Sequence, residues 1–361
     1  MKHVCFMGFM GRSLTYLVLI LSQSSWGQSL RVMSYNVQNL FDNRDNPSTR
    51  DEEFTPEGEQ KWEQSVLEDK FQNLGRVVKS VNPDILAVQE IENQEVLDEW
   101  VKKALVEGAY NHVITEKSDD PRGVRTGLIT RLPVVKVDTH QVWSEKFKDS
   151  KDRVMKTRDI LEVEIKGAKN SKIFIFVNHW PSKGGGQDAE KFRKFVAGQL
   201  REILETRQSQ FPTALILALG DFNEGLDEGT FATQLPIIRS FSDLKSDSQM
   251  GLLHLGRFEK GQLTPADGTF FFHPEKSWNL IDHIFWTLNP VYLKSKNPKW
   301  LYKKGSYGRV SVPEEFLGKF KNPQGCEILE HLREYQGRAG NRCPKGAADH
   351  FPIKADFQWT Q

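Results

Sequence analysis

The chain has 361 residues and a nearly balanced charge, with 49 Lys and Arg against 48 Asp and Glu. This balance excludes a global positive field that would recruit a polyanion, so any contact with nucleic acid must come from local clusters. The length is sufficient for one large α/β domain with a sizeable core. The sequence shows no internal repeat, coiled coil or low-complexity tract.

Residues 1–27 have the pattern of a secretory signal peptide. Lys2 and Arg12 supply positive charge, residues 14–21 form a short apolar core, and small residues precede the expected cleavage point. The apolar core is too short to span a bilayer comfortably and no polar stop pattern follows it, so an uncleaved anchor is the weaker alternative. We expect a secreted or periplasmic protein without a stable membrane anchor. Its mature chain, 28–361, would carry 47 basic against 48 acidic residues, a net charge near −1.

Apolar runs typical of buried strands alternate with helix-like segments along the chain. In chain order we expect a strand over 30–36, a helix over 66–81, a strand over 84–90, a helix over 96–105, two or three strands within 111–137, strands over 160–165 and 173–178, a helix over 190–206 and a strand over 215–221. Strand–helix–strand units favour parallel pairing, and strands that follow one another directly favour antiparallel pairing. The sequence therefore predicts an α/β fold whose sheet is mixed rather than purely parallel.

Polar residues suited to chemistry recur within or at the ends of these apolar runs and of two later ones. They are Asn36, Glu90, Asn178, His179, Asp221, Asn223, Asp282, Asp349 and His350. A single Gly-Asp-x-Asn would be read as a capped turn. The repeated pattern instead predicts one site, because ligands of open α/β sheets gather just outside the carboxyl ends of strands.

The residue types in this set suit the hydrolysis of a phosphate ester. Carboxylate and amide oxygens are ligands for Mg²⁺, Mn²⁺ or Ca²⁺ and poor ligands for zinc. A bound metal neutralises phosphoryl oxygens, a carboxylate can take a proton from water, and histidines can donate hydrogen bonds to developing negative charge. No G-x-S-x-G, C-x-x-C, G-x-G-x-x-G or Walker A sequence competes with this interpretation.

Six motifs in this order resemble the endonuclease/exonuclease/phosphatase superfamily over nearly the whole mature chain. They are Ser34-Tyr35-Asn36, Val88-Gln89-Glu90, Asn178-His179-Trp180-Pro181-Ser182-Lys183, Gly220-Asp221-Phe222-Asn223, Ile281-Asp282-His283-Ile284 and Asp349-His350-Phe351-Pro352. The superfamily includes pancreatic-type DNases, apurinic/apyrimidinic endonucleases, inositol polyphosphate phosphatases and bacterial sphingomyelinases. Residues 51–62 and 178–186 further resemble secreted bacterial endonucleases. The resemblance implies a four-layer α/β sandwich, with two mixed β-sheets face to face, helices outside and the site at one end.

The resemblance also implies a metal site. Glu90, with Asn36 and Asp349, would hold Mg²⁺, with Mn²⁺ or Ca²⁺ as alternatives. One departure concerns Gln38, which stands where DNA-repair members carry a second acidic ligand. Metal binding would then be weaker or depend more on Glu90.

The same resemblance assigns the catalytic roles. Asp221 would orient or deprotonate the attacking water, and Asn223 would fix the phosphate. His179 and His350 would contact the scissile phosphate. Asp282 would hold His350 in one tautomer, as such histidines require.

Two basic residues are expected to bind substrate. Arg158, in Lys156-Thr157-Arg158-Asp159, resembles the family arginine that reaches a substrate phosphate. Lys183 precedes three glycines and could contact a backbone phosphate, although a Gly-rich turn before a helix is an equally simple interpretation.

Residues 290–345 form a Lys- and Arg-rich excursion before the last site motif. Three aromatic residues are interleaved with the basic ones: Trp300, Tyr302 and Tyr307. Backbone charge and base stacking supply sequence-independent binding, so the excursion favours nucleic acid, while a surface loop with solvated lysines is the open alternative. Cys326 and Cys343 are most simply a disulfide in an exported protein, with a zinc site as the weaker alternative.

The first functional hypothesis is a secreted, monomeric, metal-dependent nuclease that cleaves DNA, and RNA as a further substrate, with little sequence preference. The second keeps the chemistry but acts on a phospholipid, as sphingomyelinases do, or on a small phosphate ester. No clear membrane-inserting aromatic hairpin supports it, because the run 270–272 is more easily read as a strand entering the core. The third, a non-catalytic binding module, predicts losses among the site residues, and none is lost.

Overall fold

The computed structural model describes residues 29–105, 108–116, 118–246, 249–272, 274–313, 316–321, 327–332 and 347–360. The expected signal peptide, Cys326 and Cys343 lie outside these residues, so signal cleavage and the disulfide remain predictions. In the described ranges, no helix is long and apolar enough to cross a membrane.

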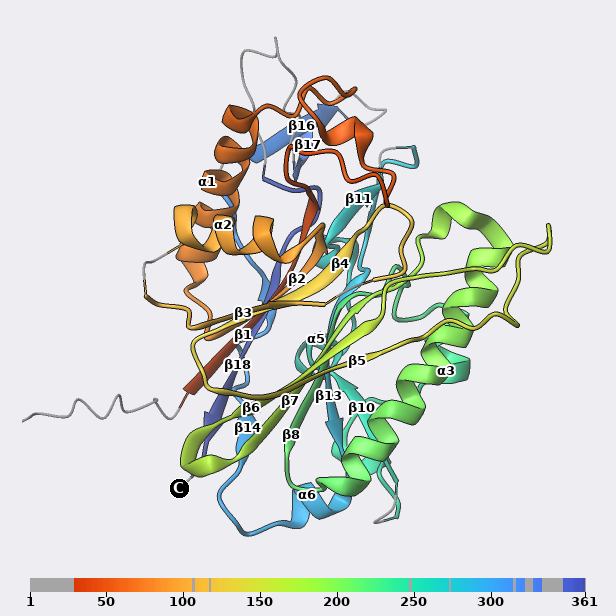
Figure 1. Cartoon of the computed structure of the whole chain (residues 1–361). Helices are drawn as coiled ribbons and strands as arrows, with labels where there is room; N and C mark the ends of the chain where they lie inside the picture. Colours follow the sequence, from red (N-terminus) through yellow and green to blue (C-terminus); the bar gives the residue numbers. More distant parts are fainter. Residues whose placement is uncertain are drawn as a thin grey trace, which may run out of the picture.

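Two seven-stranded mixed sheets form the centre of the described chain (Figure 1). The first has the order β14 (Trp300–Tyr302), β18 (Ile353–Trp359), β1 (Ser29–Leu40), β2 (Ile85–Ile91), β4 (Arg125–Thr130) and β3 (His112–Thr115), with β15 (Gly308–Arg309) also paired to β18. The second has the order β5 (Val134–His140), β6 (Ile160–Lys166), β7 (Lys172–His179), β8 (Leu215–Asp221), β13 (Asp282–Leu288), β10 (Gly251–His254) and β9 (Ile237–Ile238). Strands β1 and β2, β7 and β8, and β9 and β10 pair in parallel, and the other neighbours are antiparallel. The prediction of mixed sheets is confirmed.

Strand β1 is buried on both faces over residues 32–37, although six of its twelve residues are polar. Leu30 and Val32 belong to the hydrophobic cluster between the two sheets. Met33 and Tyr35 belong to a different cluster, beneath the helices on the other side of the first sheet. Because side chains alternate along a strand, the face that carries Val32 also carries Asn36 near the strand end. The packing between the sheets therefore leads directly into the site.

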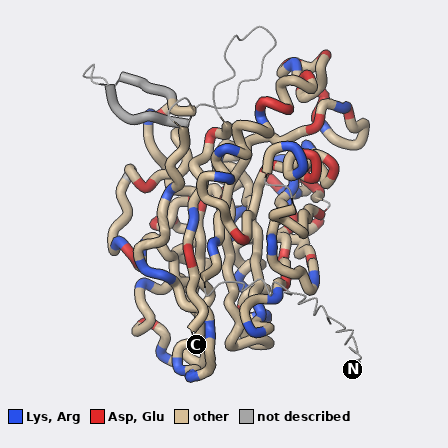
Figure 2. Tube along the Cα trace, turned by 90° about the vertical axis from the view of Figure 1, so that its left-hand side faces the viewer, with Lys and Arg blue, Asp and Glu red and all other residues tan. Residues whose placement is uncertain are grey.

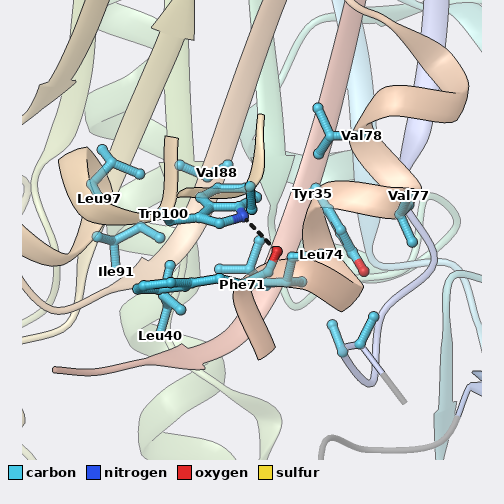
Figure 3. Close-up of a cluster of buried hydrophobic side chains, with 14 of the residues drawn as sticks. Tyr35, Leu40, Phe71, Leu74, Val77, Val78, Val88, Ile91, Leu97 and Trp100 are labelled. Atoms are coloured by element: carbon cyan, nitrogen blue, oxygen red, sulfur yellow. Dashed lines mark hydrogen bonds between the residues drawn. The ribbon is translucent and has the colours of Figure 1, made fainter. Parts of the chain in front are cut away.

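Helices α1 (Gln64–Val81) and α2 (Gln94–Ala104) cover the outer face of the first sheet (Figure 3). The indole nitrogen of Trp100 donates to the carbonyl of Phe71 at 3.2 Å and joins the two helices. Helix α1 ends where expected, at Asn82 in the left-handed conformation before Pro83. Helix α3 (Gly186–Gln210), with α4 (Gly229–Gln234), covers the outer face of the second sheet through a third hydrophobic cluster. The four-layer sandwich is confirmed.

Short elements complete the described chain. They are the helices α5 (Leu255–Lys260) and α6 (Pro290–Lys294), the 3-10 turns η1 (Glu52–Phe54), η2 (Ala168–Asn170), η3 (Lys183–Gly185), η4 (Phe241–Asp243) and η5 (Pro265–Asp267), and two hairpins, β11 (Phe270–Phe272) with β12 (Ser277–Asn279) and β16 (Leu317–Lys321) with β17 (Glu327–Leu332).

The structure corrects two expectations about aromatic residues. The run 270–272 does not join either central sheet, because it pairs with β12 in a small hairpin and, through Phe270, forms an isolated bridge with His350. Phe271 is buried against Trp278, whereas Phe272 is 38% exposed. The first part of the excursion at 290–345 is not a loop, because β14 and β15 extend the first sheet along β18. Its aromatic residues lie in or against the core between the sheets and are not available to stack on bases.

Candidate active site

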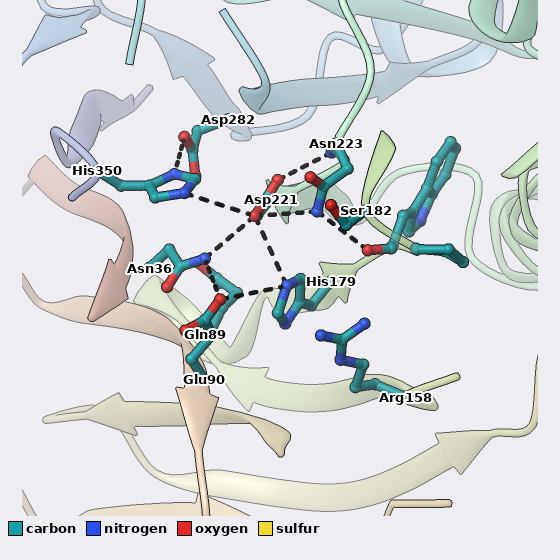
Figure 4. Close-up of polar contacts among 12 residues, drawn as sticks. Asn36, Gln89, Glu90, Arg158, His179, Ser182, Asp221, Asn223, Asp282 and His350 are labelled. Atoms are coloured by element: carbon teal, nitrogen blue, oxygen red, sulfur yellow. Dashed lines mark hydrogen bonds and ion pairs between the residues drawn. The ribbon is translucent and has the colours of Figure 1, made fainter. Parts of the chain in front are cut away.

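The strand ends meet at one end of the sandwich, as predicted. Strands β7 and β8 place His179 beside Asp221 as parallel neighbours, and the antiparallel pairing of β8 with β13 places Asp282 on the other side of Asp221. The site spans both sheets, because the amide nitrogen of Asn36 in β1 donates to Oδ2 of Asp221 in β8 at 3.1 Å. Figure 4 shows the side chains converging on Asp221.

Gly220 makes this alignment possible. Its φ of 137° is unfavourable for other residues, and a Cβ at this position would lie 2.0 Å from the carbonyl oxygen of Asn178. The close approach of the two strands therefore requires glycine. Asn178 itself is structural, since its side chain joins the indole of Trp180 to the Phe176 carbonyl.

Asp221 is the centre of the cluster and is 2% exposed. Its Oδ1 accepts from the backbone N–H of Asn223 at 2.8 Å. Its Oδ2 lies 3.6 Å from Nε2 of His179 and 3.9 Å from Nε2 of His350. Burial raises the pKa of Asp221 to about 7, although the charge of His350 opposes this rise. A carboxylate with this pKa is suited to accept a proton near neutral pH.

The pKa values of the two histidines are shifted in opposite directions. Nδ1 of His350 donates to Oδ2 of Asp282 at 2.8 Å, which directs Nε2 toward Asp221. Burial alone would lower the pKa of His350, but the charges of Asp282 and Asp349 raise it well above its usual value. Burial lowers the pKa of His179 well below its usual value, and Arg158 adds to this effect. These shifts favour the cationic form of His350 and the neutral form of His179.

Glu90 sits on a β-bulge at the end of β2, with a φ of 66°. Its Oε2 accepts from the backbone N–H of Asn39 at 2.8 Å, and its Oε1 accepts from the amide of Asn36 at 3.2 Å. Oε1 also lies 3.8 Å from Nε2 of His179. Glu90 is thus fixed with its carboxylate toward the cluster.

The donor types at this end of the sandwich fit a magnesium ion. Among the residues that the structure describes, no three His, Cys, Asp or Glu side chains form a group that could hold a metal on their own. The predicted ligands Asn36, Glu90 and Asp349 offer one amide oxygen and two carboxylates, too few to complete the coordination shell of Mg²⁺. Mg²⁺ is usually bound through one or two carboxylates, with water and substrate oxygens completing its shell. An open site centred on Glu90 is consistent with this mode of Mg²⁺ coordination.

The two predicted substrate-binding residues are placed differently. Arg158 is buried and points into the cluster, where its Nε lies 3.2 Å from Oδ2 of Asp120 and the charges of Glu90 and Asp221 act on it. Lys183 lies in η3 on the exposed rim, where its ammonium pairs with Glu228. The structure thus brings Arg158 into the site and leaves Lys183 outside the cluster.

Two residues near the site were missed by the sequence analysis. The ring of Phe270 packs 5.0 Å from that of His350. Lys70 is buried on α1, and its ammonium donates to the carbonyl of Gln38 at 2.5 Å. A signal for Lys70 exists, because it interrupts the apolar face that Leu67 and Phe71 define. By contrast, His283 serves packing as expected, since it contacts His254 and the Glu224 carbonyl.

The chain belongs to the endonuclease/exonuclease/phosphatase family, whose sequence model matches residues 31–358. No curated protein sequence matches it. Among solved structures, the fold is similar to truncated Caenorhabditis elegans TDP2, at 16% identity over 91% of this chain and 97% of that chain with a TM-score of 0.51. It is also similar to the mannosyl-6-phosphatase Bt3783 of Bacteroides thetaiotaomicron, at 15% identity over 92% of this chain and 100% of that chain with a TM-score of 0.54. A third similar structure is D. rerio TDP2 complexed with a single-strand DNA product, at 14% identity over 91% of this chain and 99% of that chain with a TM-score of 0.53.

Proposed function

We propose that this chain is a divalent-metal-dependent hydrolase that cleaves phosphodiester bonds of DNA, with RNA as a further substrate. The observation that carries the proposal is the position of Asp221, a buried carboxylate that lies between His179 and His350 and is joined to Glu90 through the amide of Asn36. Family membership supports hydrolysis of phosphate esters, while the metal and the nuclease activity are proposed from the site.

In the proposed mechanism, Asp221 accepts a proton from the attacking water. The Asn223 N–H and the Asn36 amide fix its carboxylate, so that little reorientation is needed. His350, held by Asp282, donates from Nε2 to a phosphate oxygen, and His179 donates from the opposite side. A bound divalent ion would neutralise phosphoryl oxygens and stabilise the leaving oxygen.

Positive charge from two arginines supports an anionic substrate. Arg158 lies within the cluster, and Arg122 is close enough for its charge to act on both Arg158 and His179. A guanidinium can bind two phosphate oxygens at once. In D. rerio TDP2, a protein of the same fold, the complex contains a single-strand DNA product.

A second candidate substrate, a small phosphate ester, is favoured by the charge around the site. The acidic loop (residues 42–63) contains eight Asp and Glu against three Lys and Arg. It packs against the segment that carries Asp120, since the Arg50 N–H donates to the Pro121 carbonyl at 2.9 Å. This loop would repel a long polyanion. Figure 2 shows basic and acidic positions interspersed along the described trace.

The proposed setting follows from the sequence. The leader-like residues 1–27 support export, so we place the enzyme in the periplasm or outside the cell, as a monomer. Fractionation of cells that express the full chain tests this placement, and retention in the cytoplasm would contradict it.

The function is tested by offering the mature chain supercoiled plasmid, ribosomal RNA, sphingomyelin and mannose 6-phosphate, each with Mg²⁺ and with EDTA. His179→Ala serves as the inactive variant and His112→Ala, on β3, as the control. Plasmid nicking that requires Mg²⁺ and His179 would support the nuclease. Release of phosphate from the sugar ester with intact plasmid would favour the second candidate, and cleavage of the lipid alone would refute both.

A further inference from the structure

A buried lysine lies beside the active site and has no part in the mechanism above. Lys70 projects from α1, and the residue is 1% exposed. Burial of an ammonium group is costly unless hydrogen bonds compensate for the lost water. Lys70 donates to the carbonyl oxygen of Gln38, and the charges of Glu90 and Asp349 attract it. Such a costly arrangement on an otherwise apolar helix face calls for a functional explanation.

The carbonyl that Lys70 contacts belongs to a strained turn in β1. Gln38 and Asn39 have φ values of 52° and 51°, and the register with β2 shifts between Asn36 and Leu40. Two successive residues other than glycine in the left-handed region are unfavourable by roughly 1 kcal/mol or more each. Contacts around the bulge must therefore hold it in place.

The bulge orients both ligands that line its side of the site. The Gln38 N–H donates to Oδ1 of Asn36 at 3.0 Å, and the Asn39 N–H donates to Oε2 of Glu90 at 2.8 Å. The Gln38 carbonyl and the Asn39 N–H are the two ends of a single planar peptide group. Lys70 thus binds one end of the peptide whose other end binds Glu90.

We propose that Lys70 is a positioning residue for the metal ligand Glu90 and acts through the Gln38–Asn39 peptide. Its hydrogen bond fixes the peptide plane, so that the Asn39 N–H is aimed at Oε2 of Glu90 before any metal binds. This inference rests on the proposed function, in which Glu90 holds the cation. Loss of such an outer contact typically lowers metal affinity or activity by about 10- to 100-fold.

The test compares Lys70→Met, which keeps the length but loses the donor, with Lys70→Arg and with Lys79→Met at an exposed position of the same helix. Two readouts are used on the mature chain: the dissociation constant for Mn²⁺ by electron paramagnetic resonance, and the NMR signal of the Asn39 amide without metal. We expect Lys70→Met to shift the Asn39 signal and weaken Mn²⁺ binding about 10-fold or more. Lys70→Arg should restore part of the affinity, and Lys79→Met should match the wild type.

If Lys70 acted only as a nearby positive charge, Lys70→Met would change the Mn²⁺ affinity in the opposite direction. Removing a cation would then tighten Mn²⁺ binding. Tighter or unchanged binding with an unmoved Asn39 signal would overturn the inference. If Lys70→Met does not fold, the test is the addition of Mg²⁺ to the wild type. The NMR signals of Asn39 and Lys70 should then shift, and those of Lys79 should not. Absence of Mn²⁺ binding by the wild type would refute the proposed metal dependence, and the metal-free Asn39 comparison would still show whether Lys70 orients the peptide.

Discussion

Asp282 accepts a hydrogen bond from Nδ1 of His350 at 2.8 Å, and both side chains are buried. This contact fixes the imidazole tautomer and keeps Nε2 directed at Asp221, 3.9 Å away. Burial acts to lower the pKa of His350, but the charge of Asp282 raises it. The pair therefore supplies both the orientation and the hydrogen-bond donor that the proposed mechanism requires.

Replacing Asp282 with Asn should lower kcat by about 10²- to 10⁴-fold, because the amide no longer stabilises the cationic histidine or selects its tautomer. KM should change little, since Asp282 does not contact substrate. Asp152→Asn, at a surface position, is the control. Steady-state kinetics on the preferred substrate give the comparison, and a kcat equal to that of the control would refute the role of Asp282.

The pH dependence should report Asp221. A base must be ionised to accept a proton, so kcat/KM should rise with pH as Asp221 loses its own proton. In the metal-free chain the pKa of Asp221 is about 7, and a bound cation will lower it. The rising limb should therefore lie at or below pH 7. A profile that falls with pH across this range would contradict the assignment of Asp221 as the base.

Asp159 should make the protein less stable as pH rises. Burial raises its pKa to about 6 from 3.8, and Asp119 adds to the rise, so the folded state binds more protons than the unfolded state between these values. The free energy of unfolding should fall through that window, by less than about 1 kcal/mol per pH unit because the carboxyl is partly in water. Urea unfolding of Asp159→Asn should give a shallower pH dependence than the wild type. Parallel curves would show that Asp159 does not contribute.

Gly220→Ala should destabilise the fold by about 3 kcal/mol or more, because its Cβ would clash with the Asn178 carbonyl and its φ is unfavourable for alanine. Gly229→Ala is a matched control, since a Cβ there meets nothing within 4 Å and helix α4 begins at this residue. The control should be neutral or stabilising by up to about 1 kcal/mol. Chemical denaturation gives the free energy of unfolding of each variant. Equal values for Gly220→Ala and Gly229→Ala would contradict the requirement for glycine where the two strands approach closely.

Local patterns predicted mixed strand pairing and most of the cluster, whereas the four-layer sandwich was implied by the family resemblance. Asn36, Glu90 and Asp221 follow apolar strands, and parallel strands end at one edge of a sheet. The burial of Trp300 in a strand could not be predicted in this way. An aromatic residue among lysines gives the same sequence pattern in a binding loop and in a strand of a sheet. Lys70 shows the other limit. Its position on an apolar face is visible locally, but its partner, the Gln38 carbonyl, lies 32 residues away and requires the fold.

The most direct test of the central claim is the rate at which the mature chain nicks supercoiled plasmid, measured for the wild type and for Asp221→Asn with Mg²⁺ and with EDTA. The account predicts nicking by the wild type only with Mg²⁺, and a loss of about 10³-fold or more in the variant. Plasmid left intact by the wild type, or nicked equally fast by Asp221→Asn, would contradict a metal-dependent nuclease centred on this carboxylate.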